Sequence, residues 1–309
     1  MKIFLTGASG MVGRNLLEHE EAGNHTWLTP RHSDLDLTDF IATCQYIDKK
    51  QPDLIIHAAG RVGGIQANMR EPVRFLIENL DMGRNVLLAA AKAGVPKLIN
   101  IGSSCMYPRN RNDPLKEEDV LSGELEPTNE GYALAKITIA RLADYLCRER
   151  SELNYKTVVP CNLYGRHDKF DPRWSHLIPA IIYKLHQAKI TGVRKVEIWG
   201  DGNARREFMY AGDLAEALFK ASYDLADMPS LMNIGLGYDF TVNEYYQMAA
   251  EVIGYDGEFT HDLSKPVGMN RKLTDASKAR AWGWVASSSL KEGLAKTYDF
   301  YLNTMIGNK

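Results

Sequence analysis

The chain has 309 residues, of which 45% are hydrophobic and 25% charged, and its formal net charge is −2. This length and composition predict a soluble globular protein of one large domain or two coupled ones. The small net charge argues against a nucleic-acid or anionic-membrane partner, and no apolar run is long enough for a membrane span. The four cysteines are dispersed, with neither a C-x-x-C motif nor a metal-binding pattern. Together with an N-terminus that leads directly into a strand, they predict reduced thiols in a cytoplasmic protein.

Short apolar strands alternate with helical stretches in the first half of the chain. The predicted elements are, in chain order, a strand over 3–5, a helix over 12–20, a strand over 25–29, a helix over 39–50, a strand over 53–58, a helix over 72–93, a strand over 97–102, a helix over 132–148 and a strand over 156–161. Such alternation predicts βαβ units and a parallel sheet, and the almost continuously apolar strands predict helices on both faces. The predicted fold is therefore α/β, a Rossmann-like doubly wound parallel sheet.

The pattern becomes less regular after residue 162, where proline, glycine and charged residues interrupt it at 166–172, 200–206 and 262–271. We expect residues 1–162 to form a dinucleotide-binding Rossmann domain. Residues 163–309 are expected to form a smaller α/β substrate domain. The apolar stretch at 230–235 is expected to return to the large sheet, so the boundary is predicted to be discontinuous.

A glycine-rich turn follows the first predicted strand. Gly7, Gly10 and Gly13 have the spacing G-x-x-G-x-x-G and join that strand to the next predicted helix. Glycines allow a tight turn whose backbone N–H groups can approach a pyrophosphate. A plain structural turn is the alternative, but this position within a βαβ unit favours a dinucleotide. The predicted cofactor contacts here and at the end of the third strand are Gly7, Gly10, Met11, Val12, Gly13, Ala58, Ala59 and Gly60.

The second predicted strand ends near Arg31, and no carboxylate stands early in the turn that follows it. An acidic residue at this place would bind the adenine ribose hydroxyls of NAD, whereas an arginine can pair with the 2′-phosphate of NADP. Arg31 therefore predicts NADP(H) as the cofactor. The alternative is that Arg31 is a solvated loop charge.

Tyr132 and Lys136 stand four residues apart in a predicted helix, so their side chains share one face. A tyrosine with its usual pKa of about 10 transfers protons poorly at neutral pH. A nearby ammonium and a positive nicotinamide would lower that pKa. Ser103, just past the fourth predicted strand, can hold a carbonyl oxygen. An exposed helix pair is the alternative, but the order of these motifs predicts hydride-transfer chemistry.

This order resembles the extended branch of the short-chain dehydrogenase/reductase superfamily. The segments 62–65, 102–108, 126–130, 162–165, 175–179 and 206–208 further resemble the GDP-L-fucose synthase family. These segments are spread over most of the chain and are more specific than the superfamily motifs. The resemblance implies an NADPH-dependent enzyme that epimerises GDP-4-keto-6-deoxymannose at C3 and C5 and then reduces the C4 ketone.

The resemblance also implies roles for individual residues. Cys105 is implied as the base that removes a proton beside the ketone, and His176 as the acid that returns one. Both residue types can titrate near neutrality, although a buried cysteine or a structural histidine is the plainer alternative. Tyr132 would stabilise the enolate and then protonate O4 during reduction.

Binding contacts and assembly are implied in the same way. Cofactor contacts are implied for Lys136, Asn162, Leu163 and His176, and GDP-sugar contacts for Asn162, Lys184, Trp199, Arg206 and Lys272. Arginine and lysine can pair with diphosphate oxygens, and Trp199 could pack on the ligand or within the core. A homodimer through the predicted helices 72–93 and 132–148 is expected.

The chain departs from the family pattern in three places. Ala8-Ser9 stands where fucose synthases frequently have His-Arg, Tyr183-Lys184 stands where two arginines are common, and several side chains differ over 166–174. These differences leave GDP-L-colitose synthase, which would epimerise only C5, and a GDP-heptose reductase as alternatives. A non-catalytic NADP-binding regulator and an epimerase that retains its cofactor are alternatives from other functional classes.

Overall fold

The computed structural model describes residues 1–171, 175–265 and 269–306, so the last three residues of the predicted loop 166–174 lie outside the described residues. Its central element is a six-stranded sheet with the order β10-β5-β4-β3-β1-β2, and every neighbouring pair is parallel. The strands are β1 (Lys2–Thr6), β2 (Thr26–Leu28), β3 (Leu54–His57), β4 (Lys97–Ile101), β5 (Asn154–Pro160) and β10 (Leu231–Ile234). The predicted doubly wound α/β fold is confirmed.

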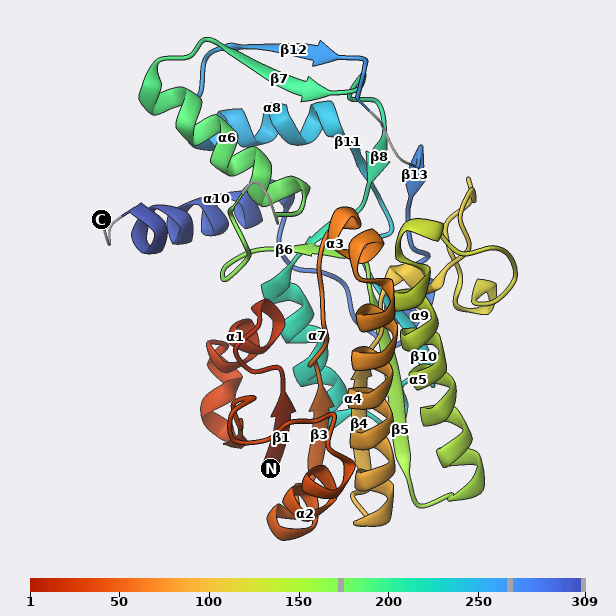
Figure 1. Ribbon diagram of the computed structural model, residues 1–309. Helices are drawn as coiled ribbons and strands as arrows, with labels where there is room; N and C mark the ends of the chain where they lie inside the picture. Colours follow the sequence, from red (N-terminus) through yellow and green to blue (C-terminus); the bar gives the residue numbers. More distant parts are fainter. Residues whose placement is uncertain (172–174, 266–268, 307–309) are drawn as a thin grey trace.

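Helices cover both faces of this sheet. The helices α2 (Phe40–Lys50), α4 (Pro72–Lys92) and α5 (Glu130–Glu149) pack on one face, where α4 and α5 lie side by side (Figure 1). The helices α1 (Met11–Leu17) and α7 (Ala211–Tyr223) pack on the other. Along β1, Ile3 and Leu5 enter the core beneath α1 and α7, whereas Phe4 enters the opposite core. Burial on both faces explains why apolar residues dominate these strands rather than alternating with polar ones.

A second core lies in the upper part of Figure 1. It is built from α6 (Leu177–Thr191), α8 (Val242–Ile253), α10 (Leu290–Tyr301) and the parallel pair β7 (Lys195–Trp199) and β12 (Glu258–Asp262). The helices α8 and α10 each begin at a capping box, formed by Thr241 with Glu244 and by Ser289 with Glu292. These boxes satisfy backbone donors that a helix start otherwise leaves unpaired.

The remaining elements are short. They are the strands β6 (Asn162–Tyr164), β8 (Arg205–Arg206), β9 (Phe208–Tyr210), β11 (Phe240–Thr241) and β13 (Arg271–Lys272), the helices α3 (Ile65–Arg70) and α9 (Ser277–Ala281), and the single turns η1 (Glu20–Asn24), η2 (Ser104–Met106), η3 (Glu117–Asp119), η4 (Pro127–Asn129) and η5 (Leu302–Ile306). The helix α3 was not predicted. Pro72 begins α4 directly after it, because a proline is tolerated at the first position of a helix but not inside one.

The later half of the chain contributes to both cores. The helix α7 and the strand β10 pack into the large sheet, and α9 contacts β10, although all three follow residue 162. The division of the chain into two domains at residue 162 stays a prediction. None of the helices in the described part of the chain combines the length and apolar character that a bilayer crossing requires.

Candidate active site

A large cavity of about 1680 Å³ opens at the carboxyl ends of β1, β3 and β4. Ligands of doubly wound sheets bind at this edge, near the point where the strand order reverses, which here lies between β1 and β3. Residues of β8 and β13 form part of the wall that faces the sheet. The cavity is therefore bounded both by the large sheet and by the short strands β8 and β13.

The glycine turn forms the floor of this cavity. Gly7 has a φ of +70°, and a Cβ atom there would lie 2.7 Å from the backbone nitrogen of Ala59. A Cβ atom on Gly13 would lie 2.5 Å from the carbonyl oxygen of Gly7, so the first helix can approach the turn only with glycine at this position. The predicted cofactor residues that line the cavity are Gly7, Gly10, Met11, Val12, Arg31, Ala58, Ala59, Gly60, Lys136, Asn162, Leu163 and His176. Gly13 lies behind the turn and shapes it.

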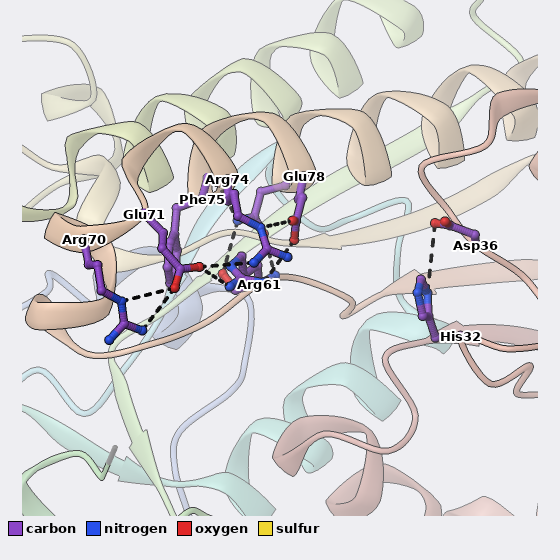
Figure 2. Close-up of polar contacts among 9 residues, drawn as sticks. His32, Asp36, Arg61, Arg70, Glu71, Arg74, Phe75 and Glu78 are labelled. Carbon is purple, nitrogen blue, oxygen red and sulfur yellow. Dashed lines mark hydrogen bonds and ion pairs between the residues drawn. The ribbon is translucent and has the colours of Figure 1, made fainter. Parts of the chain in front are cut away.

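Arg31 and His32 lie at one end of the cavity, after β2. The backbone N–H of Arg31 donates to the carboxylate of Asp34, at 3.1 Å, and the side chain of Arg31 is exposed. The His32 imidazole lies 4.0 Å from the carboxylate of Asp36 (Figure 2). An exposed guanidinium at this end can meet an anion that enters from solvent.

Tyr132, Lys136 and Ser103 come together at the inner end of the cavity. Lys136 Nζ donates to the carbonyl oxygen of Ile101, at 2.8 Å, and lies 5.9 Å from the centre of the Tyr132 ring. Burial lowers the pKa of Lys136 to about 8. Burial and the charge of nearby Cys105 raise the pKa of Tyr132, and a hydrogen bond with Ser103 opposes this shift.

The protein groups alone thus raise the pKa of Tyr132, and the lowering expected from Lys136 together with the nicotinamide stays a prediction. Desolvation disfavours the phenolate, and the hydrogen bond with Ser103 offsets only part of that effect. A phenol with a raised pKa keeps its proton at neutral pH. Tyr132 is thus a hydrogen-bond donor that can deliver a proton to an oxygen once that oxygen becomes basic.

Cys105 lies in η2, directly after β4, and its sulfur has two nitrogen neighbours. Asn129 Nδ2 donates to Cys105 Sγ at 3.2 Å, and Lys272 Nζ donates to it at 3.8 Å. The Ser103 hydroxyl caps η2 by accepting from the backbone N–H of Cys105. Asn129 belongs to a segment that pointed to the family, but spacing alone gave it no role, because it reaches Cys105 only through the fold.

His176 also lines the cavity and precedes the first turn of α6. Burial, and to a smaller extent the charge of Lys169, lower the pKa of His176. The imidazole is therefore neutral at physiological pH. It must take up a proton before it can act as an acid, or act while hydrogen-bonded to a proton source.

Two of the predicted substrate residues, Arg206 and Lys272, lie opposite each other on the paired strands β8 and β13 and line the cavity. Two others lie outside its lining. The Trp199 side chain is 60% exposed with Lys265 Nζ 5.7 Å from its ring, and Lys184 Nζ donates to the carbonyl oxygen of Glu197 at 2.6 Å. Sequence spacing could not tell which of these four residues line the cavity, since their elements are brought together only in the folded chain.

Glu207 stabilises the strands β8 and β13, which contain Arg206 and Lys272. Its buried carboxylate accepts from the backbone N–H groups of Leu236, Gly237 and Thr274 and from the Thr274 hydroxyl, at 2.6–3.0 Å. Burial raises the pKa of Glu207, whereas these hydrogen bonds favour the charged form. One carboxylate therefore ties β8 to the chain after β10 and to the chain after β13.

Glu207→Gln is expected to lower the free energy of unfolding by roughly 2 kcal/mol or more, because an amide NH₂ would face donors that need an acceptor. Urea denaturation measures this loss. Glu258→Gln is the matched control, since the Glu258 side chain is 73% exposed and should leave stability unchanged. Equal stability of Glu207→Gln and the wild type would contradict this account.

Arg61 attaches the segment 62–70 to the helix α4, and residues of this segment line another part of the cavity. Its guanidinium bonds the carboxylates of Glu71 at 2.5 Å and Glu78 at 3.2 Å and lies 5.4 Å from the centre of the Phe75 ring. Figure 2 shows the guanidinium between the two carboxylates beneath α4. The pair Arg61–Glu71 joins both ends of the segment, so the loop and α3 are anchored to α4. The sequence singled out 62–65 but not this anchor.

Comparisons with known proteins agree with this arrangement. Residues 3–235 match the family described as "Epimerase: NAD dependent epimerase/dehydratase family". A GDP-L-colitose synthase of Yersinia pseudotuberculosis is 52% identical, with 98% of each chain covered. A GDP-L-fucose synthase of Azorhizobium caulinodans is 48% identical, with 97% of this chain and 96% of that protein covered. A GDP-mannoheptose C4 reductase of Campylobacter jejuni, solved with NADP bound, has a TM-score of 0.89 and 29% identity over 97% of this chain and 98% of that one.

Proposed function

This chain belongs to the NAD dependent epimerase/dehydratase family, and on that basis we propose that it is an NADPH-dependent epimerase and 4-reductase of a GDP-4-keto-6-deoxyhexose. The observation that carries the proposal is the convergence of Ser103, Cys105, Tyr132, Lys136 and His176 on the cavity that contains the glycine turn. A non-catalytic regulator would not need this set of proton donors and acceptors beside a dinucleotide site.

The residues fit a dinucleotide, because the cradle at Gly7 and Gly13 would be filled by any side chain. Bound NADPH supplies the hydride that reduces the C4 ketone. In the proposed chemistry, Cys105 removes the proton from a carbon beside that ketone, and His176 returns a proton on the opposite face. Tyr132, held beside Ser103 and Lys136, donates to O4 while the enolate exists and transfers its proton to O4 on reduction.

The proposed cofactor is NADP(H) rather than NAD(H), and Arg31 is proposed to bind its 2′-phosphate. Arg31→Ala is expected to weaken NADPH binding at least roughly tenfold, because a bidentate charge-assisted contact is lost, and to leave NADH binding unchanged. Fluorescence titration with each nucleotide measures both affinities. Arg148→Ala, a surface arginine paired with Asp144, is the control. An unchanged NADPH-to-NADH ratio in Arg31→Ala would remove Arg31 from the site.

The GDP-sugar is proposed to lie against β8 and β13, where Arg206 and Lys272 bring positive charge to the cavity. Trp199 and Lys184 are proposed to contact its nucleotide end from the edge of β7 and α6. GDP-L-fucose is the proposed product, because six segments of the sequence resemble the GDP-L-fucose synthase family. GDP-L-colitose is the second candidate, favoured by the 52% identity to the colitose synthase of Yersinia pseudotuberculosis. A GDP-heptose is a third substrate class to include.

One assay separates these substrates. The protein is incubated with NADPH and, in turn, with GDP-4-keto-6-deoxymannose, its 3-deoxy analogue and a GDP-4-keto-heptose, in deuterated water. We expect stoichiometric NADPH oxidation with one of the 6-deoxy sugars, and NMR of the product shows whether C3 and C5 or only C5 was exchanged. Turnover without NADPH consumption, or no turnover with any of the three, would overturn the proposed function.

The proposed assembly is a homodimer through α4 and α5, in the cytoplasm. Exposed apolar side chains on these two helices support the dimer, among them Val73, Ile77, Leu134 and Tyr145. The cysteines are free thiols in the described part of the chain, which suits a reducing compartment. Light scattering of the wild type measures the mass, and a monomer at micromolar concentration would reject this assembly.

A further inference from the structure

The surroundings of the Cys105 sulfur are more specific than a general base requires. Its two nitrogen neighbours come from distant parts of the chain, since Asn129 ends η4 and Lys272 lies in β13. Residues separated by 24 and 167 positions thus meet at one sulfur atom. The family resemblance implied a GDP-sugar contact for Lys272 and gave Asn129 no role.

The chemistry of these neighbours defines the role of the sulfur. A lysine ammonium has donors and no acceptor, so Cys105 Sγ must accept the hydrogen bond from Lys272. This conclusion holds for either orientation of the Asn129 amide. An ammonium and an amide that donate to one sulfur atom are both placed to stabilise negative charge on it.

Asn129 carries a second sign of a functional position. Its Oδ1 atom is buried and has no hydrogen-bond partner within residues 1–171, 175–265 and 269–306. A buried oxygen without a partner costs free energy unless a water or a ligand bonds it. Asn129 also lines the cavity three residues before Tyr132, at the start of α5.

We propose that Asn129 and Lys272 are positioning residues that hold Cys105 as a thiolate aimed into the cavity, an assignment that rests on the proposed function. The thiolate takes the proton from the carbon beside the ketone and becomes a thiol, and the electron pair of the broken C–H bond moves into the enolate. The negative charge thus passes from sulfur to O4, where Tyr132 donates. In this assignment Lys272 stabilises the Cys105 sulfur for proton transfer, and Arg206 pairs with the diphosphate of the substrate.

The test is the rate at which iodoacetamide alkylates Cys105, followed by peptide mass spectrometry. Only the thiolate reacts, so the rate reports its population. Asn129→Ala and Lys272→Met are each expected to slow alkylation roughly tenfold or more, the effect of losing a hydrogen bond to a charged group. Lys272→Arg, which keeps a cation, should retain most of the wild-type rate. Asn129→Ala removes side-chain atoms beside Cys105, so a slower reaction in that variant cannot come from shielding.

The control is Lys92→Met, at the exposed end of α4, and NADPH affinity confirms that each variant is folded. Should one substitution unfold the protein, the other carries the same test. With the keto-sugar, both variants should lose solvent deuterium exchange in the same proportion as alkylation. Wild-type alkylation in both, with only a higher KM for the GDP-sugar, would overturn the proposal and make Lys272 a diphosphate ligand. Alkylation needs no substrate, so it still decides the inference if the proposed function fails.

Discussion

Tyr132→Phe is expected to reduce NADPH oxidation by about 10²- to 10⁴-fold, the usual contribution of a positioned general acid. The variant removes one oxygen and leaves the ring in its packed position on α5. The physical reason is that phenylalanine has no hydroxyl to hydrogen-bond O4 or to give it a proton during reduction. Stopped-flow absorbance of NADPH with saturating keto-sugar measures this single step.

Tyr223→Phe is the matched control for this variant, since Tyr223 lies at the end of α7, is 54% exposed and is absent from the cavity lining. It should oxidise NADPH at the wild-type rate. NADPH affinity should be the same in both variants, because neither change alters the glycine turn. Normal NADPH oxidation by Tyr132→Phe would reject Tyr132 as the acid.

Cys105→Ser is expected to lower solvent deuterium incorporation into the keto-sugar by about 10²- to 10⁴-fold, with NADPH binding unchanged. A serine hydroxyl has nearly the same shape as a thiol but is far less acidic, so it supplies almost no anion at neutral pH. The donors at Asn129 and Lys272 would remain in place and would have no thiolate to hold. NMR of the sugar signals in deuterated water follows the exchange.

Cys44→Ser is the matched control for this substitution, because Cys44 lies in α2 and is absent from the cavity lining. It should exchange deuterium as fast as the wild type. Full exchange by Cys105→Ser would eliminate Cys105 as the base and would leave the reductase assignment of Tyr132 standing.

The fold could be predicted from the sequence to a large extent. The strands β1, β3 and β4 are short, largely apolar runs, and α4 and α5 have long helical patterns, so local hydrophobicity determines both their type and their order. The helix α3 escaped prediction because it is short and depends on its attachment to α4. The end of α1 at Leu17, earlier than predicted, has the same cause, since helix ends depend on local caps and tertiary contacts.

The glycine turn and the pair Tyr132–Lys136 were recognisable along the chain because each depends on short spacing within one element. The partners of Cys105, the carboxylate of Glu207 that supports β8 and β13, and the anchor at Arg61 involve residues far apart in sequence. Hydrogen bonds and ion pairs act over a few ångströms, so such groups become identifiable only when the chain has folded. The raised pKa of Tyr132 also depends on the folded chain, because its main cause is burial, which the local spacing to Lys136 does not reveal.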